Sequence, residues 1–299
     1  MTNKPANETA TDSSEQPRIL PRDQHCISRQ QIDEDVLKVL YRLHRKGFLA
    51  YLVGGSVRDM LLGRQPKDFD IGTDASPAQI KRLFRNCFLV GKRFRLAHIR
   101  FHGNKLVEVA TFRRHPRTEE LPDDPDDHFH FVQNVFGTPR EDAFRRDFTI
   151  NALFYDIGSF SIVDHMGGLE DLEKCQIRVI GDPRVRFEED PVRMLRALEF
   201  CARLDFSLEG GIVEAITECA PLIADASPAR IREEMMELYR HKVSGKVLLM
   251  SKEKGLLPHL LAGYPGDEAS LQLLQLVDDR TASGIAIDES FAIAALFLN

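Results

Sequence analysis

Two carboxylates one residue apart are the first feature of this sequence that could do chemistry. Residues 67–70 read KDFD, and the apolar run that follows Asp70 is typical of a strand. Alternate side chains of a strand share a face, so Asp68 and Asp70 would lie about 6.6 Å apart. They would repel each other by roughly 2.5 kcal/mol at an effective dielectric of ~20. A divalent cation relieves such repulsion, and Mg²⁺ (or Mn²⁺) binds carboxylates together with substrate phosphates.

A phosphate-binding turn is indicated upstream of the two aspartates. Gly54 and Gly55 follow a short apolar run and precede a helix-like segment. Glycines there let backbone N–H groups approach a phosphate at a helix N-terminus. Ser56 and Arg58 would add a hydroxyl and a guanidinium. A tight turn and a solvated strand end explain each half alone, but the two halves in this order favour a nucleotide and metal site.

The elements that must position these residues follow from hydrophobic periodicity and from turn and cap residues. Ser28 with Gln31 predicts a capped helix over 28–46. Ser76 with Pro77 predicts another over 75–86. The other elements predicted in this half are strands at 48–55 and 68–72, a helix at 56–63, a hairpin over 96–113, a loop over 114–140, and a strand or buried helix at 148–156.

Helical patterns dominate after about residue 174. A helix is predicted over 189–204, with Asp190 as its cap and Pro191 at its first position. Ser227 and Pro228 predict a second such helix over 227–242. The chain stops within an apolar run without a helix-stop signal, so we expect its last region to be truncated.

Composition places the chain among ordinary globular proteins. It has 299 residues, of which 43% are hydrophobic and 29% charged. No apolar run is long enough to span a membrane, and the polar N-terminus lacks the apolar core of a signal peptide. The five cysteines are scattered, without a CxxC pair, which argues against a zinc site or disulfide framework and predicts a reducing cytoplasm.

Charge is distributed unevenly along the chain. The formal net charge of −6 at first argues against a nucleic-acid partner. Residues 81–100, however, hold seven Lys or Arg and no acid, whereas residues 118–129 hold six acids and no Lys or Arg. A local basic stripe can bind phosphates despite a negative total, so the net charge does not exclude RNA.

The segment LVGGSVRDMLLGRQPKDFDIGT (52–73) resembles the class II nucleotidyltransferases, which comprise bacterial poly(A) polymerases and tRNA CCA-adding enzymes. RRDFTINAL (145–153), VDHMGGLEDL (163–172), EDPVRMLRALEF (189–200) and SPARIREEMMEL (227–238) resemble the family's later motifs in the same order. The resemblance implies an α+β fold with a polymerase-β-like head, in which helices flank a mixed sheet, and an all-helical neck and body. The expected bounds are a disordered tail at 1–24, the head at 25–172, the neck at 173–242 and the body at 243–299.

The resemblance also implies a reaction. In the family, an RNA 3′-hydroxyl attacks the α-phosphate of a nucleoside triphosphate and releases pyrophosphate with the help of two metal ions. Asp68 and Asp70 would hold the metals, Asp147 matches a further catalytic position, and Glu108 is a candidate for a third metal-side carboxylate. The expected nucleotide-binding residues of the head are Gly54, Gly55, Ser56, Arg58, Arg146 and Asn151.

Choice of the base is expected to rest on the 189–200 segment. Asp190, Arg193 and Arg196 are spaced three apart and would share a helix face. A carboxylate accepts from an exocyclic amine and an arginine donates to ring acceptors, so such a set can read a base edge. Arg230 and Glu233 are expected to brace these readers. A capped helix with solvated arginines is the structural alternative.

Residues 19–29 and 89–101 resemble segments of bacterial poly(A) polymerases, and Arg93 and Arg95 would guide triphosphate or primer phosphates. The predicted function is therefore template-independent addition of AMP from ATP to RNA 3′ ends. The alternative is a tRNA nucleotidyltransferase, CCA-adding or A-adding.

A non-catalytic RNA-binding relative would lack a carboxylate in KDFD or RRDF, and none is lacking. The histidines show no His-Asp pair at metal-ligand spacing, which disfavours a phosphohydrolase.

Overall fold

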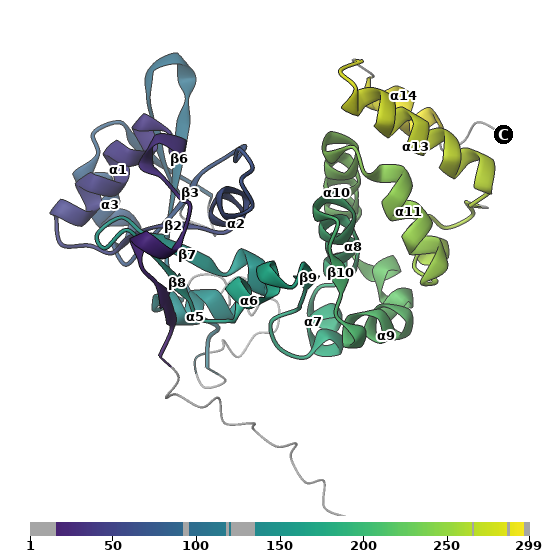
Figure 1. Ribbon diagram of the computed structural model, residues 1–299, viewed down its shortest axis with the longest axis horizontal. Coiled ribbons are helices and arrows are strands. Elements are labelled where there is room, and N and C mark those ends of the chain that lie inside the picture. Colours follow the sequence, from purple (N-terminus) through teal and green to yellow (C-terminus); the bar gives the residue numbers. More distant parts are fainter. Residues whose placement is uncertain are drawn as a thin grey trace, which may run out of the picture.

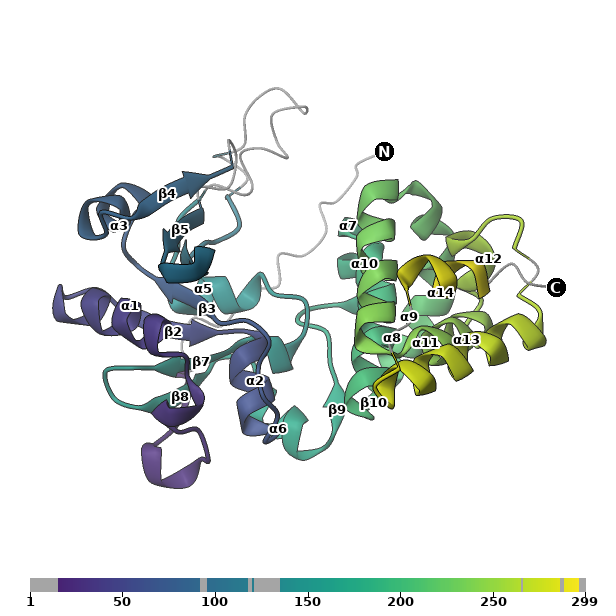
Figure 2. The same cartoon turned by 90° about the horizontal axis from the view of Figure 1, so that it is seen from above.

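The computed structural model describes residues 16–91, 96–117, 120, 135–264, 266–285 and 288–295. The first part of the chain forms a mixed sheet with helices, and the second part is a set of packed helices (Figures 1 and 2). The sheet has eight strands in the order β1-β8-β7-β2-β3-β6-β5-β4. Its strands are β1 (Arg18–Leu20), β2 (Ala50–Val53), β3 (Asp70–Thr73), β4 (Cys87–Val90), β5 (Leu96–Arg100), β6 (Leu106–Thr111), β7 (Leu153–Asp156) and β8 (Ser161–Asp164). The predicted α+β class is confirmed.

The register of three neighbouring strands brings the candidate residues to one end of the sheet. β2 pairs antiparallel with β3, so Val53 lies opposite Asp70, and the Gly54 turn follows directly. β3 pairs in parallel with β6, which places Glu108 opposite Asp70. The glycine turn and the two carboxylates are therefore neighbours because of strand pairing, although they lie far apart in sequence.

Helices flank this sheet and start at residues that the sequence marks. The α-helices of the head are α1 (Glu34–Arg45), α2 (Gly55–Leu61), α3 (Pro77–Leu83), α5 (Pro139–Phe144) and α6 (Gly168–Glu173). The 3₁₀ helices are η1 (Arg22–Gln24), η2 (Arg29–Gln31), η3 (His102–Asn104) and η5 (Thr149–Asn151). Helix α3 has the predicted cap, Ser76, and the predicted Pro77 at its start, and Ser76 also forms a capping box with Gln79. The predicted hairpin over 96–113 is confirmed as β5 and β6 joined at η3.

Two predictions near the N-terminus are wrong. The capping box of Ser28 and Gln31 exists, but it closes the short η2, and Ile32 is extended. Helix α1 begins only after Asp33, whose carboxylate accepts hydrogen bonds from the backbone amides of Asp35 and Val36. Part of the 1–24 segment, which the sequence predicts to be disordered, is ordered among the described residues. Arg18–Leu20 forms β1 and pairs with β8, which gives the backbone groups along that edge of β8 hydrogen-bond partners.

The segment at 148–156, which periodicity left open between strand and helix, is both. It begins as η5 and continues as the buried strand β7, which pairs with β2 and β8. Phe148, Ile150 and Phe154 are all buried. A run that is apolar at every position carries no period, so only its neighbours decide its backbone.

Helices make up most of the second part. They are α7 (Pro183–Glu189), α8 (Val192–Leu204), α9 (Gly210–Cys219), η6 (Ala220–Asp225), α10 (Pro228–His241), α11 (Ser244–Glu253), α12 (Leu257–Leu260), α13 (Glu268–Ala282) and α14 (Glu289–Ala295). The expectation of an all-helical region misses one feature: the two-residue strands β9 (Gln176–Ile177) and β10 (Ser207–Leu208) pair in parallel and join the start of the region to the end of α8. The predicted domain bounds themselves stay predictions.

The two parts share a continuous core. One cluster of buried apolar side chains runs from the head, including Leu52 and Ile71, to Leu195 and Leu198 of α8 and Leu274 of α13. All five cysteines are free. None of the helices in the described ranges has the length and apolar character needed to cross a membrane.

The 163–172 segment is folded around one buried carboxylate within the head. Asp164 at the end of β8 is 2% exposed and accepts from the backbone amides of Met166, Gly167, Gly168 and Leu169 at 2.9–3.1 Å. A Cβ on Gly168 would lie 2.3 Å from the carbonyl oxygen of Thr149, so only glycine fits there. The GG of this segment is thus a packing requirement of the loop into α6.

We predict that Asp164→Ala lowers the free energy of unfolding by about 3 kcal/mol, because it leaves several buried amides without an acceptor. Asp182→Ala is the matched control, since Asp182 also accepts from two backbone amides, at the start of α7, but is exposed. Its loss should cost only about 1 kcal/mol. Urea unfolding followed by circular dichroism measures both, and equal losses would contradict the role assigned to Asp164.

Candidate active site

The carboxylates of Asp68 and Asp70 lie in a groove of about 910 Å³, together with Glu108. Asp70 is the first residue of β3, whereas Asp68 precedes the strand. The observed strand therefore begins two residues later than the strand predicted at 68–72. Within the described part of the chain, no side chain forms an ion pair or a hydrogen bond with either aspartate carboxylate. Two neighbouring carboxylates without a directly bonded cation are a donor set that suits a divalent ion.

Electrostatics around Asp70 point the same way. Although Asp70 is exposed, the surrounding protein desolvates its carboxylate and raises its pKa; the charges of Glu108 and Asp68 raise that pKa further, and Arg146 opposes them. Glu108 also faces His98, whose Nε2 lies 3.3 Å from Glu108 Oε1. Among the residues with defined positions, no three His, Cys, Asp or Glu side chains form a metal site by themselves. The residues therefore fit Mg²⁺, which binds one or two carboxylates and completes its shell with substrate phosphates and water.

The glycine turn lies beside this groove. Gly54 has φ +73°, a backbone conformation that favours glycine, and a Cβ there would lie 2.9 Å from Arg146 Nη1 and displace that guanidinium. Gly55 and Ser56 open α2, where the first amides of a helix have no backbone acceptor. The Ser56 hydroxyl, however, is buried and donates to the carbonyl of Val53 at 3.3 Å. The predicted phosphate contact of this hydroxyl is wrong, because the side chain points into the head.

Arg58 is likewise turned inward. It is 3% exposed, its Nε donates to Asp59 Oδ1 at 2.8 Å, and its Nη1 donates to Asn151 Oδ1 at 2.5 Å. Asn151 is 7% exposed and donates from Nδ2 to Asp147 Oδ1 at 3.2 Å. These contacts contradict the expectation that Arg58 and Asn151 touch the nucleotide, since both side chains are buried and already bonded to other residues of the protein.

Arg146 is the cation between the glycine turn and Asp70. Its Nη1 donates to the carbonyl of Asn151 at 3.0 Å, and its Nη2 to Asp142 Oδ2 at 3.1 Å. The guanidinium also lies over the ring of Phe154, 5.4 Å from the centroid. These contacts fix its charge next to the turn, where it lowers the pKa of Asp70.

Asp147 lies in a second pocket, away from Asp68 and Asp70. Its Oδ2 accepts from Arg196 Nε and Nη2 at 2.9 and 2.7 Å, and its Oδ1 accepts from the amide of Phe148. Burial would raise the pKa of Asp147, but the Arg196 guanidinium and the hydrogen bonds from Asn151 and Phe148 hold it below its usual value. Its catalytic role stays a prediction; the geometry is that of a carboxylate that orients an arginine.

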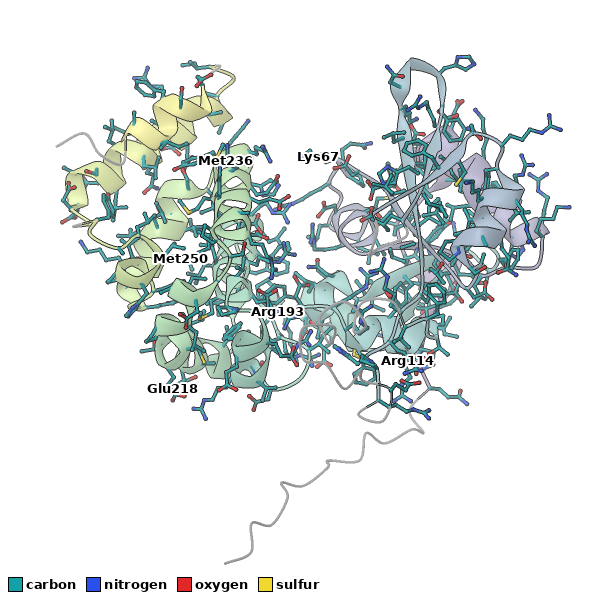
Figure 3. All side chains as sticks on the ribbon, turned by 180° about the vertical axis from the view of Figure 1, so that it is seen from behind. Lys67, Arg114, Arg193, Glu218, Met236 and Met250 are labelled. Carbon is teal, nitrogen blue, oxygen red and sulfur yellow. The ribbon has the colours of Figure 1, made fainter. Side chains whose placement is uncertain are left out.

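The second pocket, of about 290 Å³, lies where the head meets α8 and α10. It is lined by Arg146, Asp147, Asp190, Arg193, Arg196, Arg230 and Glu234. Figure 3 shows Arg193 at this junction, and Lys67 extending from the head toward the helix that carries Met236. The volume is at the lower end of the range for small-ligand pockets, which is roughly 300–1,000 Å³.

Asp190 is the polar centre of this pocket. The prediction that it caps α8 is wrong: it ends α7 with an extended backbone, and Pro191 precedes α8 without a capping side chain. Its Oδ2 instead accepts from Arg230 Nη2 at 2.7 Å. Its Oδ1 is buried and has no partner among the described residues. A buried acceptor without a donor is costly, so this oxygen is suited to accept from a ligand amine.

The arginines expected to read the base differ in their partners. Arg193 Nη1 donates to the carbonyl of Arg186 at 2.8 Å and to Glu189 Oε2 at 3.0 Å. Arg196 is bonded to Asp147 and, from Nη1, to Glu234 Oε1 at 3.2 Å. Arg196 is thus a bridge between head and α10 more than a free reader. Arg193 keeps its place beside Asp190, with its Nε 3.9 Å from Asp190 Oδ2.

Of the two α10 residues that were expected to brace the base readers, Arg230 contacts one of them and Glu233 does not. Arg230 bonds Asp190, as expected. Glu233 is exposed, and the carboxylate that bonds Arg196 is Glu234. Successive residues of a helix are about 100° apart around its axis, so two adjacent glutamates face different directions. The sequence alone does not show which of them faces the pocket. Arg93 and Arg95 lie outside the described residues.

Arg186 is a site residue that the sequence reasoning missed. It is 6% exposed and donates from Nη2 to the carbonyls of Arg145 and Arg146 at 3.0 and 2.8 Å. Its Nη1 bonds Glu189 at 2.7 Å. Arg186 thereby ties α7 to the backbone of the 145–153 segment. The sequence carries no sign of this, because a buried arginine and a solvated one have the same letter and spacing.

Comparisons with known proteins identify relatives of this chain. The family profile described as "Poly A polymerase head domain" matches residues 50–178. A second, "Probable RNA and SrmB-binding site of polymerase A", matches residues 205–266. Poly(A) polymerase I of Salmonella typhi is 43% identical over 293 residues, covering 93% of this chain and 63% of that protein. The CCA-adding enzyme of Bacillus pumilus is 38% identical over 227 residues, covering 75% of this chain and 55% of that protein.

Solved structures extend the comparison to the fold. The crystal structure of a tRNA nucleotidyltransferase complexed with a primer tRNA and an incoming ATP analog aligns with a TM-score of 0.69 and 30% identity, covering 86% of this chain and 74% of that one. The chain thus spans less than two thirds of the curated relatives, but most of a solved relative. On these matches, and on the arrangement of the glycine turn, the paired aspartates and the pocket at α8, the chain belongs to the nucleotidyltransferase family of the poly(A) polymerases and CCA-adding enzymes.

Proposed function

We propose that this protein transfers AMP from ATP to RNA 3′ ends without a template, as a polynucleotide adenylyltransferase. The observation that carries the proposal is a pair of carboxylates without a directly bonded cation, Asp68 and Asp70, next to a glycine turn that opens α2. In this reaction an RNA 3′-hydroxyl oxygen forms a bond to the α-phosphorus while the bond to the pyrophosphate oxygen breaks. Such a reaction depends mostly on positioning and on charge stabilisation.

Each part of the site has a role in this proposal. Asp68 and Asp70 would hold Mg²⁺ or Mn²⁺, whose charge lowers the pKa of the attacking hydroxyl and stabilises the leaving pyrophosphate. The amides of Gly55 and Ser56 receive a phosphate, and Arg146 offsets the negative charge that gathers beside Asp70. Glu108 is the candidate third carboxylate, because it lies opposite Asp70 in the strand register.

The pocket at α8 supports a base that carries an amine. Asp190 Oδ1 accepts from the exocyclic amine, and Arg193 donates to ring acceptors. Adenine and cytosine each have an exocyclic amine next to a ring acceptor, whereas guanine and uracil have a carbonyl and a ring N–H at the corresponding positions, so these two residues favour ATP and CTP over GTP and UTP. The preference for ATP is supported by the 40–43% identity to proteins named poly(A) polymerase I, which exceeds the 38% identity to the CCA-adding enzyme. Transcripts in the cytoplasm would be the substrates.

A primer and nucleotide panel tests the proposal. With Mg²⁺, the purified protein should extend labelled oligo(A) with ATP and use CTP poorly, as resolved on denaturing gels. Asp68→Ala or Asp70→Ala should abolish extension, whereas Asp225→Ala, at an exposed carboxylate on η6, should not. Addition of C, C and A to a trimmed tRNA without extension of oligo(A) would establish the tRNA nucleotidyltransferase instead. No incorporation on either substrate would refute nucleotidyl transfer.

A second prediction concerns the stability of the metal-free protein. Because its folded-state pKa is raised above 3.8, the Asp70 carboxyl contributes stability when protonated and loses that contribution as the pH rises through the folded-state pKa. Asp70→Asn should therefore raise the melting temperature at about pH 7.5, with a gain that shrinks as the pH falls toward about 4. Added Mg²⁺ should raise the melting temperature of the unmodified protein more than that of the variant.

Scanning calorimetry with and without Mg²⁺ measures both effects, and Asp225→Asn controls for loss of one exposed charge. An Asp70→Asn variant that is less stable than the unmodified protein, or equally stabilised by Mg²⁺, would be inconsistent with a charged cation site at Asp70.

A further inference from the structure

We propose that Asn151 is a positioning residue that holds the phosphate turn and the base pocket in one geometry, and that it thereby sets the preference among nucleoside triphosphates. The inference rests on the proposed nucleotidyl transfer and assigns a role to a residue that touches neither end of the nucleotide. It comes from a continuous path of side-chain hydrogen bonds between the two regions.

The path has Asn151 at its centre. Arg58 Nη1 donates to Asn151 Oδ1 at 2.5 Å, and Asn151 Nδ2 donates to Asp147 Oδ1 at 3.2 Å. Asp147 Oδ2 then accepts from Arg196, which bonds Glu234 from its other side. The oxygen and the nitrogen of the Asn151 side-chain amide thus bond two different residues of the head, and Asp147 carries the path on to α8 and α10 through Arg196.

Both ends of the path reach the site. At one end, Arg58 lies against the glycine turn: its backbone amide donates to the carbonyl of Gly54 at 3.4 Å, and a Cβ on Gly55 would lie 3.3 Å from its Nη2. At the other end, Asp147, Arg196 and Glu234 line the base pocket. The carbonyl of Asn151 also accepts from Arg146, so the backbone of the same residue holds the cation beside Asp70.

A second contact ties the same partners together. The guanidinium groups of Arg58 and Arg196 lie 5.0 and 5.5 Å from the centroid of the Phe200 ring on α8. Phe148 of the head meets that ring edge-on at 5.3 Å. Arg58 in the head and Arg196 on α8 therefore contact the same buried aromatic ring. A displacement of the ring by one arginine would change the contact made by the other.

Loss of the Asn151 bonds should act on base choice more than on turnover. Asp147 would lose the donor to Oδ1 and could rotate with Arg196, which changes the shape and charge of the base pocket. Arg58 would keep Asp59, so the glycine turn would retain one support. Buried networks of this kind respond as a unit, because each unmade bond leaves a polar group without water.

The test compares two substitutions at Asn151 with a matched control on the same 3₁₀ helix. Asn151→Ala removes both bonds, and Asn151→Asp keeps the volume and the Arg58 contact but faces Asp147 with a second carboxylate. Thr149→Val is the control: Thr149 is buried and donates to Asp171, outside the path. The readout is kcat and KM for ATP and for CTP on oligo(A), with melting temperatures of all variants.

We expect the ratio of kcat/KM for ATP over CTP to fall about tenfold in both Asn151 variants, the size expected for loss of a charge-assisted hydrogen bond. The change should lie mainly in KM. Thr149→Val should lower the melting temperature and leave the ratio unchanged. In a double-mutant cycle, Asn151→Ala with Arg196→Lys should lose no more selectivity than Arg196→Lys alone, because both act on one network.

An Asn151→Ala or Asn151→Asp protein that folds and keeps the original ratio overturns the inference, as does an equal loss of selectivity in Thr149→Val. Should Asn151→Ala not fold, Asn151→Asp decides, and Arg58→Lys gives an independent measurement from the other end of the bond. Absence of nucleotidyl transfer by the unmodified protein would refute the proposed function, whereas calorimetric binding of ATP and CTP without primer would still test the role of Asn151.

Discussion

Negative charge gathered at the start of β3 is the constraint on which the rest of this structure depends. Asp68, Asp70 and Glu108 lie in one groove, and the pKa of Asp70 is raised by desolvation and by its two acidic neighbours. A protein selected only for stability would not keep these groups together. The surrounding structure responds to them: a glycine turn leaves amides open to an anion, and Arg146 is held beside Asp70 by Asp142 and a backbone carbonyl.

The second constraint is the distance between the two regions that a nucleotide would bridge in the proposed reaction. The glycine turn belongs to the head, and Asp190 lies between α7 and α8. Their relation is held by guanidinium groups that cross the junction: Arg196 bonds Asp147, and Arg186 bonds the carbonyls of Arg145 and Arg146. Arginine suits this task because its planar fork makes several hydrogen bonds at once and remains charged when buried.

This use of arginine explains where sequence reasoning about the site succeeded and failed. Asp68, Asp70 and the Gly54 turn do lie beside one another, as their local pattern indicates, and their roles with a metal and a phosphate stay a prediction. Arg58, Ser56 and Asn151 were assigned to the nucleotide on the same reasoning, but their side chains point into the head and bond Asp59, Val53 and Asp147. A polar side chain next to a phosphate turn can point toward the nucleotide or into the protein, and the local sequence does not determine which direction it adopts.

The sequence by itself determined the α+β class, the starts of α3 and α10, the hairpin of β5 and β6, and the family, since caps, periodicity and motif order act over a few residues. Tertiary structure alone decided that β1 joins the sheet, that Asp190 bonds Arg230 instead of capping α8, and that Glu234 rather than Glu233 meets Arg196. Each of these depends on a partner more than 30 residues away. A capping or helix-face pattern indicates which side chains could make a contact. Which of them does so depends on the free energy of burying a charge together with its partner.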